Sequence, residues 1–391
     1  MRKLSKTSSQ IDGQPMFKLL DKIKKLESNG KDIIHFEIGD PDFDTPKNIS
    51  DATINALKNG QTHYVSSFGL AELRQKICES IEKSRGFKPE LEQVLVTPGA
   101  NIVIFYAVSC LVDPGEEIIF PDPGFPTYNA AIKMCGASPV RVPLLESNEF
   151  RMNPDDIEKS ITKKTKMVII NSPQNPTGSV MTKDEIKATY EIAEKHDLFL
   201  YSDEIYSKLI YDNNKYSSPS IFDKCKERTI LADGFSKAYA MTGWRLGLVV
   251  GPSDVIEKMQ LLLETTSSCV SPFIQKAGIE AIDEDQTFHK YMHSEYRKRR
   301  DLIVRELNSI EGVDCVMPGG AFYVFINIKK TNMTSEQFCD YILEDADVAI
   351  LPGTSFGRFG EGYVRMCYAV KQERIVDAVE RIRNSMKKLK L

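Results

Sequence analysis

The stretch GFSKAYAMTGWRLG, residues 234–247, follows the short apolar run TILAD and contains one lysine, Lys237, and one arginine, Arg245. A short apolar run that ends in a turn is typical of a strand buried on both faces of a sheet. Lys237 then lies just beyond the carboxyl end of that strand. In an open α/β sheet this is the edge at which ligands bind. The stretch therefore predicts a buried strand with a candidate ligand-binding lysine at its end.

Five more apolar runs of the same kind occur along the chain. They are QVLVTPG, EEIIFPDPG, KMVIINSP, LFLYSDE and RLGLVVG. Helical patterns lie between them: Leu73, Ile77 and Ile81 repeat every four residues, and Thr182 begins a capping-box pattern. Alternating strands and helices predict an α/β fold with a mostly parallel sheet flanked by helices.

The last hundred residues show a different pattern. VDCVMPGGAFYVFINI is typical of a hairpin, DVAILPGTSFG and GYVRMCYAV predict two more strands, and a final helix begins at about Gln372. This pattern indicates a smaller α+β unit, onto which we expect the N-terminal segment to cross back. We therefore expect a large domain over 48–290 and a small domain built from 1–47, with an N-terminal arm, and 291–391.

Composition excludes several classes of protein. The 391 residues are 41% hydrophobic and 27% charged, which is typical of a globular chain with a large core. The net charge of −4, without a basic stripe, argues against nucleic-acid binding. The longest apolar run, IVIFYAVSCLV, is too short to span a membrane, and no secretory signal is expected.

Cysteine and histidine patterns give no sign of a metal site. The eight cysteines form no CxxC pair and are expected to be reduced, as in a cytoplasmic protein. The five histidines show no HExxH motif. His289 and His293 lie four residues apart on a predicted helix, and we expect them on an exposed face.

Small and polar residues follow the ends of several predicted strands. They are Gly99, Ala100, Asn101, Phe125, Asn175, Asp203, Tyr206, Ser236, Lys237 and Arg245. Taken singly, each has an ordinary explanation as a cap, a core aromatic, a turn or a surface charge. Because the carboxyl ends of parallel strands meet at one edge, we expect these residues to share one crevice.

Together these groups match the needs of pyridoxal 5′-phosphate (PLP). A deprotonated lysine such as Lys237 forms a Schiff base with an aldehyde. The pyridine ring needs a carboxylate at its nitrogen, which Asp203 offers. Tyr206 and Asn175 offer hydrogen bonds to the phenolic oxygen, and Phe125 offers a face for stacking. The small-residue turn 99–101, at a helix N-terminus, together with Arg245, suits the phosphate.

At this point the sequence resembles the class I/II aminotransferases of fold type I, near the aspartate and alanine aminotransferases. The resemblance covers nearly the whole chain. It rests on the blocks IGDPDFDTP, THYVSSFGLAELR, VTPGANIVIF, PDPGFPTY, NSPQNPTG, YSDEIY, GFSKAYAMTGWRLG, GGAFYVF and GYVRMCYA. Together these blocks are far more specific than any one of them.

The resemblance implies roles for particular residues. Lys237 would bond to the cofactor and move the proton between the substrate Cα and the cofactor. Arg365 would bind the substrate α-carboxylate bidentately, helped by Asn175 and the backbone of Gly39. Tyr64 would reach the phosphate of the neighbouring subunit, which makes the protein a homodimer.

Two positions depart from the family pattern. Many relatives have a serine that contacts the phosphate where this chain has Gly234, which leaves Ser236 as the nearby candidate. Some aspartate-specific relatives have a lysine that binds the distal carboxylate where this chain has Asn101. The second departure argues against aspartate and leaves neutral or unusual amino donors open.

We expect a PLP-dependent aminotransferase. It would move an amino group from an L-amino acid to a 2-oxo acid, 2-oxoglutarate or pyruvate, by a ping-pong mechanism. A carbon–sulfur lyase or another eliminating enzyme of the same fold would use the same residues around the cofactor. A ligand-sensing domain without catalysis is the remaining alternative. Its usual DNA-binding segment has no counterpart in the sequence.

Overall fold

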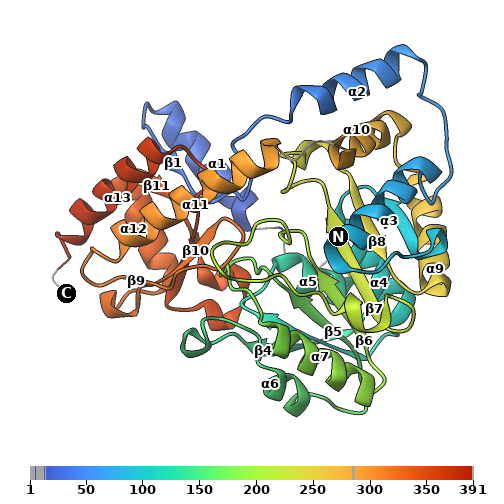
Figure 1. Ribbon diagram of the computed structural model, residues 1–391. Helices are drawn as coiled ribbons and strands as arrows, with labels where there is room; N and C mark the ends of the chain where they lie inside the picture. The colour runs from blue at the N-terminus through green and yellow to red at the C-terminus, as the bar shows by residue number, and fades with distance from the viewer. Residues whose placement is uncertain (1–4, 6–12, 14, 284–286, 390–391) are drawn as a thin grey trace.

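The computed structural model describes residues 5, 13, 15–283 and 287–389, and it places two main sheets side by side (Figure 1). The strands are β1 (Ile34–His35), β2 (Val94–Thr97), β3 (Glu117–Asp122), β4 (Ser138–Pro143), β5 (Thr165–Asn171), β6 (Phe199–Asp203), β7 (Thr229–Gly234), β8 (Gly247–Val250), β9 (Asp314–Cys315), β10 (Tyr323–Asn327), β11 (Val348–Ala349), β12 (Leu351–Pro352) and β13 (Tyr363–Cys367). The expected strands of the α/β region are all present, and β4 is an addition.

The helices are α1 (Pro15–Ser28), α2 (Lys47–Lys58), α3 (Ala71–Arg85), α4 (Val103–Leu111), α5 (Pro126–Met134), α6 (Pro154–Lys159), α7 (Lys183–Lys195), α8 (Ser220–Asp223), α9 (Ser253–Ser267), α10 (Pro272–Asp283), α11 (Thr287–Leu307), α12 (Ser335–Ala346) and α13 (Gln372–Met386). Two local signals in the sequence are confirmed. Thr182 caps α7 with a complete capping box, and α3 ends at Gly86 in a left-handed conformation.

The large sheet has seven strands in the order β2-β8-β7-β6-β5-β3-β4. Its strands are parallel except β8, which runs antiparallel to both of its neighbours. Alternate strand residues face two layers of helices, because successive side chains point to opposite faces. Helices α4, α5 and α9 cover one face, while α3 and α10, then α6 and α7, cover the other. The predicted mostly parallel sheet flanked by helices is therefore confirmed.

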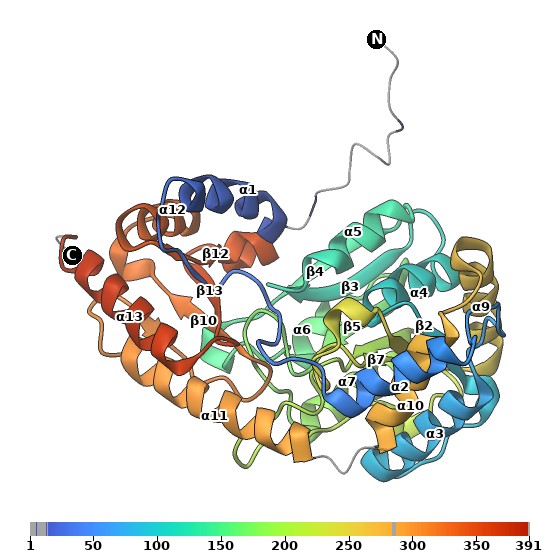
Figure 2. The ribbon, with the colours of Figure 1, turned by 90° about the horizontal axis from the view of Figure 1, so that it is seen from above.

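The small sheet is antiparallel, in the order β12-β13-β10-β9, and β1 pairs with β11 beside it. Helices α11, α12 and α13 pack on it around one core (Figure 2). The strand pair β9 and β10 forms the expected antiparallel connection, and α13 begins at the expected Gln372. Figure 2 also shows α1 next to α12. The division at residues 48 and 290 stays a prediction, and most of the predicted N-terminal arm lies outside the described residues.

The expected exposed face at His289 and His293 is wrong. Both side chains are partly buried, and the Nε2 of His293 lies 2.6 Å from the carbonyl oxygen of Ile210. Burial lowers the pKa of His289 to about 4, which keeps its ring neutral. The two histidines therefore pack in the interior, although α11 itself was expected.

Candidate active site

A cavity of about 520 Å³ lies at the carboxyl ends of β5, β6 and β7 and reaches the small sheet. Its volume is typical of a site for a small molecule. Eleven of the thirteen predicted site residues line it: Gly39, Ala100, Asn101, Phe125, Asn175, Asp203, Tyr206, Ser236, Lys237, Arg245 and Arg365. The convergence expected at one sheet edge is therefore present.

The other two predicted residues lie outside this lining. Gly99 lies directly behind it, against the guanidinium group of Arg245. Tyr64 lies in the segment between α2 and α3, and it is 86% exposed. Its predicted contact with a neighbouring subunit stays a prediction.

Lys237 follows β7 and extends into the cavity. Its Nζ donates a hydrogen bond to the carbonyl oxygen of Gly39 at 2.6 Å. Burial is the main reason why its pKa falls from 10.5 to about 8, and the nearby charge of Asp40 opposes that shift. A lysine with such a pKa presents a much larger fraction of neutral, nucleophilic amine near neutral pH than an ordinary lysine does.

Asp203 ends β6 and points into the same cavity. Burial raises the pKa of its carboxyl group to about 6. The Tyr128 hydroxyl donates to its Oδ2 at 2.6 Å, and the backbone N–H of Ile205 donates to its Oδ1 at 3.2 Å. These two donors fix the carboxyl group, whose raised pKa suits the sharing of a proton with a basic ring nitrogen.

The Tyr128 contact was not predicted, although Tyr128 belongs to the PDPGFPTY block. It follows Phe125 by three residues, which places both rings at the start of α5. The two rings lie edge to face, with their centroids 5.7 Å apart. Helical spacing after Phe125 is the one signal that pointed to it.

The turn before α4 forms a cradle for an anion. Gly99 has φ of 88°, and a Cβ on it would overlap with the Arg245 guanidinium group. A Cβ on Gly247 would overlap with the backbone nitrogen of Ala100. Because β8 runs antiparallel between β2 and β7, it brings Gly247 against this turn. Two glycines thus permit a close approach of backbone N–H groups and a guanidinium group, the donors that a phosphate prefers.

The residue before Arg245 is the single tryptophan of the sequence. The Nε1 of Trp244 donates to the Oγ1 of Thr45 at 3.0 Å, which ties the Arg245 turn to the segment before α2. The Arg245 guanidinium group itself donates to the carbonyl oxygen of Thr242 at 2.8 Å. These contacts hold the arginine beside the cradle.

Arg365 comes from β13 and is fully buried. Its guanidinium group lies between two rings, 4.6 Å from the centroid of Tyr323 and 4.7 Å from that of Phe356. It donates to Asn175 Oδ1 at 3.2 Å and to the carbonyl oxygen of Glu37. Its Nε has no hydrogen-bond partner among the described residues. Buried donors are rarely left unpaired, so this group is suited to receive a carboxylate.

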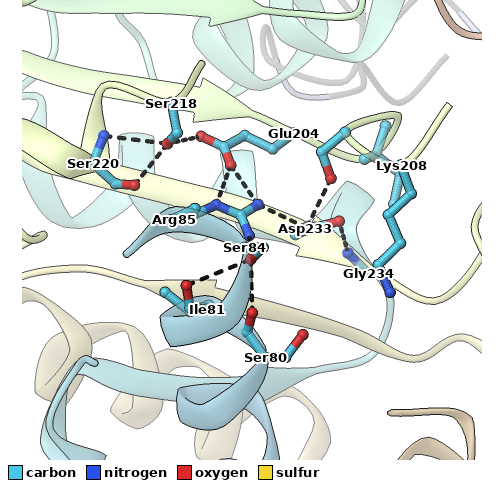
Figure 3. A network of polar contacts seen from close by, with 12 residues as sticks. Ser80, Ile81, Ser84, Arg85, Glu204, Lys208, Ser218, Ser220, Asp233 and Gly234 are labelled. Atoms are coloured by element: carbon cyan, nitrogen blue, oxygen red, sulfur yellow. Dashed lines mark hydrogen bonds and ion pairs between the residues drawn. The ribbon is translucent and has the colours of Figure 1, made fainter. Parts of the chain in front are cut away.

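A buried ion-pair network lies behind the strands that carry Asp203 and Lys237 (Figure 3). Arg85, the last residue of α3, donates to Glu204 Oε2 through two nitrogens, at 2.9 and 2.6 Å. It also reaches Asp233 Oδ2 at 3.2 Å. Glu204 directly follows Asp203, and Asp233 belongs to the end of β7, so Arg85 joins the ends of the two strands. The sequence gave no sign of this network, because its members are more than a hundred residues apart.

Within the described residues, no group of three or more His, Cys, Asp or Glu side chains is arranged to hold a metal ion. No helix of the described chain has the length and apolar character needed to cross a membrane. The eight cysteines are all free thiols. The functional groups of the cavity are therefore a lysine, an aspartate, two arginines, phenols and amides.

Comparison with known proteins agrees with this site. The family model "Aminotransferase class I and II" matches residues 31–382. The chain is 42% identical to an aspartate aminotransferase of Pyrococcus horikoshii over 94% of this chain and 93% of that protein. It is 38% identical to aromatic-amino-acid aminotransferase 2 of Thermococcus litoralis over 99% of both.

A solved structure shows the same likeness in three dimensions. The aspartate aminotransferase from Rhizobium meliloti superposes with a TM-score of 0.95, covers 100% of both chains and is 33% identical. The family match, the full-length relatives and the cavity with its lysine, aspartate and two arginines lead to one assignment. The chain belongs to the class I and II aminotransferase family and is a PLP-dependent enzyme.

Proposed function

We propose that this aminotransferase uses Lys237, Asp203, Arg245 and Arg365 for four separate tasks, and that its amino donor has an uncharged side chain. When bound, PLP supplies an aldehyde that reacts with amines and a ring that withdraws electrons from the attached carbon. The cavity fits this cofactor, because the two-glycine cradle accommodates a phosphate and Asp203 lies fixed at the opposite end. The other steps belong to residues of the chain.

Lys237 is the residue that moves the proton. Its Nζ lies in the cavity with a pKa lowered to about 8, so the neutral amine is available as a base near neutral pH. The amine takes a proton from the Cα of the substrate and delivers it on the cofactor side. Tyr206 and Asn175 are assigned to the phenolic oxygen, Phe125 to the ring face, and Ser236 to the neighbourhood of the phosphate.

Arg365 binds the α-carboxylate. It is buried, it is held between two rings, and its Nε is free for an acceptor among the described residues. A planar guanidinium group binds a carboxylate through two parallel hydrogen bonds, which also orients the Cα–H bond. The backbone of Gly39 lines the cavity next to it.

The charge inventory of the cavity carries the proposal on the donor. Its basic side chains within the described chain are Lys237, Arg245 and Arg365. Each of them already has a task, at the aldehyde, the phosphate and the α-carboxylate. Asn101 stands where a lysine would bind a distal carboxylate in some relatives. An uncharged donor side chain, aromatic or aliphatic, therefore suits the cavity better than aspartate does.

The proposal extends to assembly and location. Tyr64 is a large aromatic residue that is 86% exposed in the single chain. A homodimer in which Tyr64 reaches the partner's phosphate would give it a role. The eight free thiols suit the cytoplasm, where cysteines stay reduced. Sedimentation would give the mass, and Tyr64→Phe should weaken cofactor binding without changing that mass.

The first experiment is a spectral titration of the purified holoenzyme with single L-amino acids in the absence of any oxo acid. We expect phenylalanine, leucine or methionine to convert the lysine-linked absorption band at lower concentrations than aspartate does. Conversion by aspartate at the lower concentration would overturn the proposed donor class. Adding pyruvate or 2-oxoglutarate then identifies the acceptor from the return of the band. Accumulation of ammonia and pyruvate with the band unchanged would instead establish the eliminating reaction.

A further inference from the structure

The Tyr323 hydroxyl lies at the centre of the cavity wall, between groups of the two sheets. Tyr323 is the first residue of β10 and is 1% exposed, although it lines the cavity. Its hydroxyl oxygen is 2.7 Å from the hydroxyl oxygen of Tyr206, which follows β6 of the large sheet. The two rings meet edge to face, with their centroids 5.7 Å apart. This hydrogen bond connects the two halves of the site.

The same side chain contacts the two groups assigned to the substrate carboxylate. The Arg365 guanidinium carbon lies 4.6 Å from the centre of the Tyr323 ring, a cation–π contact in a buried setting. A Cβ on Gly39 would overlap with the Tyr323 hydroxyl, so the Gly39 backbone lies directly against it. The carbonyl oxygen of Gly39 accepts the hydrogen bond of Lys237.

The direction of the hydroxyl protons follows from this arrangement. A phenol has one proton to donate and can also accept. Burial keeps the pKa values of Tyr206 and Tyr323 well above the ordinary range, so both stay protonated. If Tyr206 donates its proton into the cavity, its oxygen can accept the proton of Tyr323. The positive charge of Arg365 lies over the Tyr323 ring and strengthens that donation.

We propose that Tyr323 is a positioning residue that directs the Tyr206 proton to the phenolic oxygen of the cofactor and links it to the carboxylate site at Arg365. The inference rests on the proposed roles of Tyr206 and Arg365. Tyr323 does not touch the reacting atoms; it acts through Tyr206. Its contribution is a fixed direction for one hydrogen bond, which would otherwise be shared among several orientations.

The test compares Tyr323→Phe with Tyr206→Phe, the double variant and Tyr368→Phe as holoenzymes. Tyr323→Phe removes one oxygen and keeps the ring over Arg365. Tyr368→Phe is the matched control, because Tyr368 is equally buried in the small domain and its hydroxyl donates to Ala321 O at 3.2 Å. That carbonyl oxygen also accepts from Tyr211, so the control leaves it paired.

The readout is the pH titration of the lysine-linked absorption band, with kcat and KM measured separately. A donor to the phenolic oxygen favours the deprotonated form, so weakening it raises the spectral pKa. We expect a rise of about half a pH unit in Tyr323→Phe, equivalent to a roughly threefold change in proton affinity. Tyr206→Phe should shift the pKa further in the same direction, and the double variant should add nothing to that shift. Tyr368→Phe should titrate like the wild type.

Three results would overturn the inference. They are a wild-type titration in Tyr323→Phe, a shift in Tyr323→Phe that adds fully to that of Tyr206→Phe, and an equal shift in Tyr368→Phe. In each of these cases a shift in Tyr206→Phe would leave the proposed function standing. No shift in Tyr206→Phe would overturn the proposed role of Tyr206 itself, and the inference with it.

Discussion

The lowered pKa of Lys237 gives a quantitative prediction for the cofactor-free protein. At pH 7 an amine with a pKa of about 8 is neutral in roughly one molecule in eleven. With the ordinary pKa of 10.5 the neutral fraction would be roughly one in three thousand. Burial therefore makes the nucleophilic form of Lys237 about 300-fold more abundant at this pH.

The assay is the rate at which the cofactor-free protein bonds to added PLP, followed by stopped-flow absorbance from pH 6 to 10. The rate constant should rise about tenfold per pH unit and then level off near pH 8, because it follows the neutral amine. A free lysine derivative, measured in parallel, corrects for the titration of PLP itself. A rate that keeps rising tenfold per unit between pH 8.5 and 10, after that correction, would refute the argument.

The same pKa difference appears in the stability of the cofactor-free protein. Between pH 8 and 10.5 the unfolded chain binds more protons at Lys237 than the folded chain does, so the free energy of unfolding rises with pH across that window. Below pH 8 the buried charge destabilises the fold by about 3 kcal/mol, at 1.36 kcal/mol per pH unit. Lys237→Met should therefore raise the free energy of unfolding at pH 7, measured with denaturant. A Lys237→Met protein less stable than the wild type at every pH would contradict this.

Three further substitutions test the site. Arg85→Met leaves two buried carboxylates without their partner, so it should lower the free energy of unfolding by about 3–5 kcal/mol at pH 7 and by less at pH 4; equal losses at both would exclude a charge effect. Gly247→Ala should weaken PLP binding at least about tenfold in equilibrium titrations, because the added Cβ meets backbone. Gly243→Ala is its control, since a Cβ there meets nothing within 4 Å. Asn101→Lys should raise kcat/KM for aspartate relative to phenylalanine, and an unchanged ratio would remove Asn101 from the distal site.

The strands and the chemistry at their ends could be predicted from the sequence, because both depend on local patterns. Short apolar runs predict buried strands, and the residues after them must meet at one edge. The strand β4 was missed, since SPVRVP contains two prolines and no continuous apolar run. The antiparallel direction of β8 was also beyond reach, because a run of residues carries no information on its direction in a sheet.

The supporting contacts of the site could not be predicted for a different reason. Arg85 and Tyr323 act through partners more than a hundred residues away, and nothing in their local sequence marks them. Tyr128 was within reach through its spacing from Phe125. The two histidines of α11 were misjudged because their helix faces Ile210, a contact that only the packing of two distant segments creates.

The position of the single tryptophan has a practical consequence. Trp244 directly precedes Arg245 and donates a hydrogen bond to Thr45, so the only indole of the chain stands beside the cradle proposed for the phosphate. Its emission is a built-in optical reporter of cofactor loading, free of background from other indoles. Energy transfer to a bound chromophore would quench it, and release would restore it. Occupancy could thus be followed in real time, in unmodified protein, without any labelled ligand.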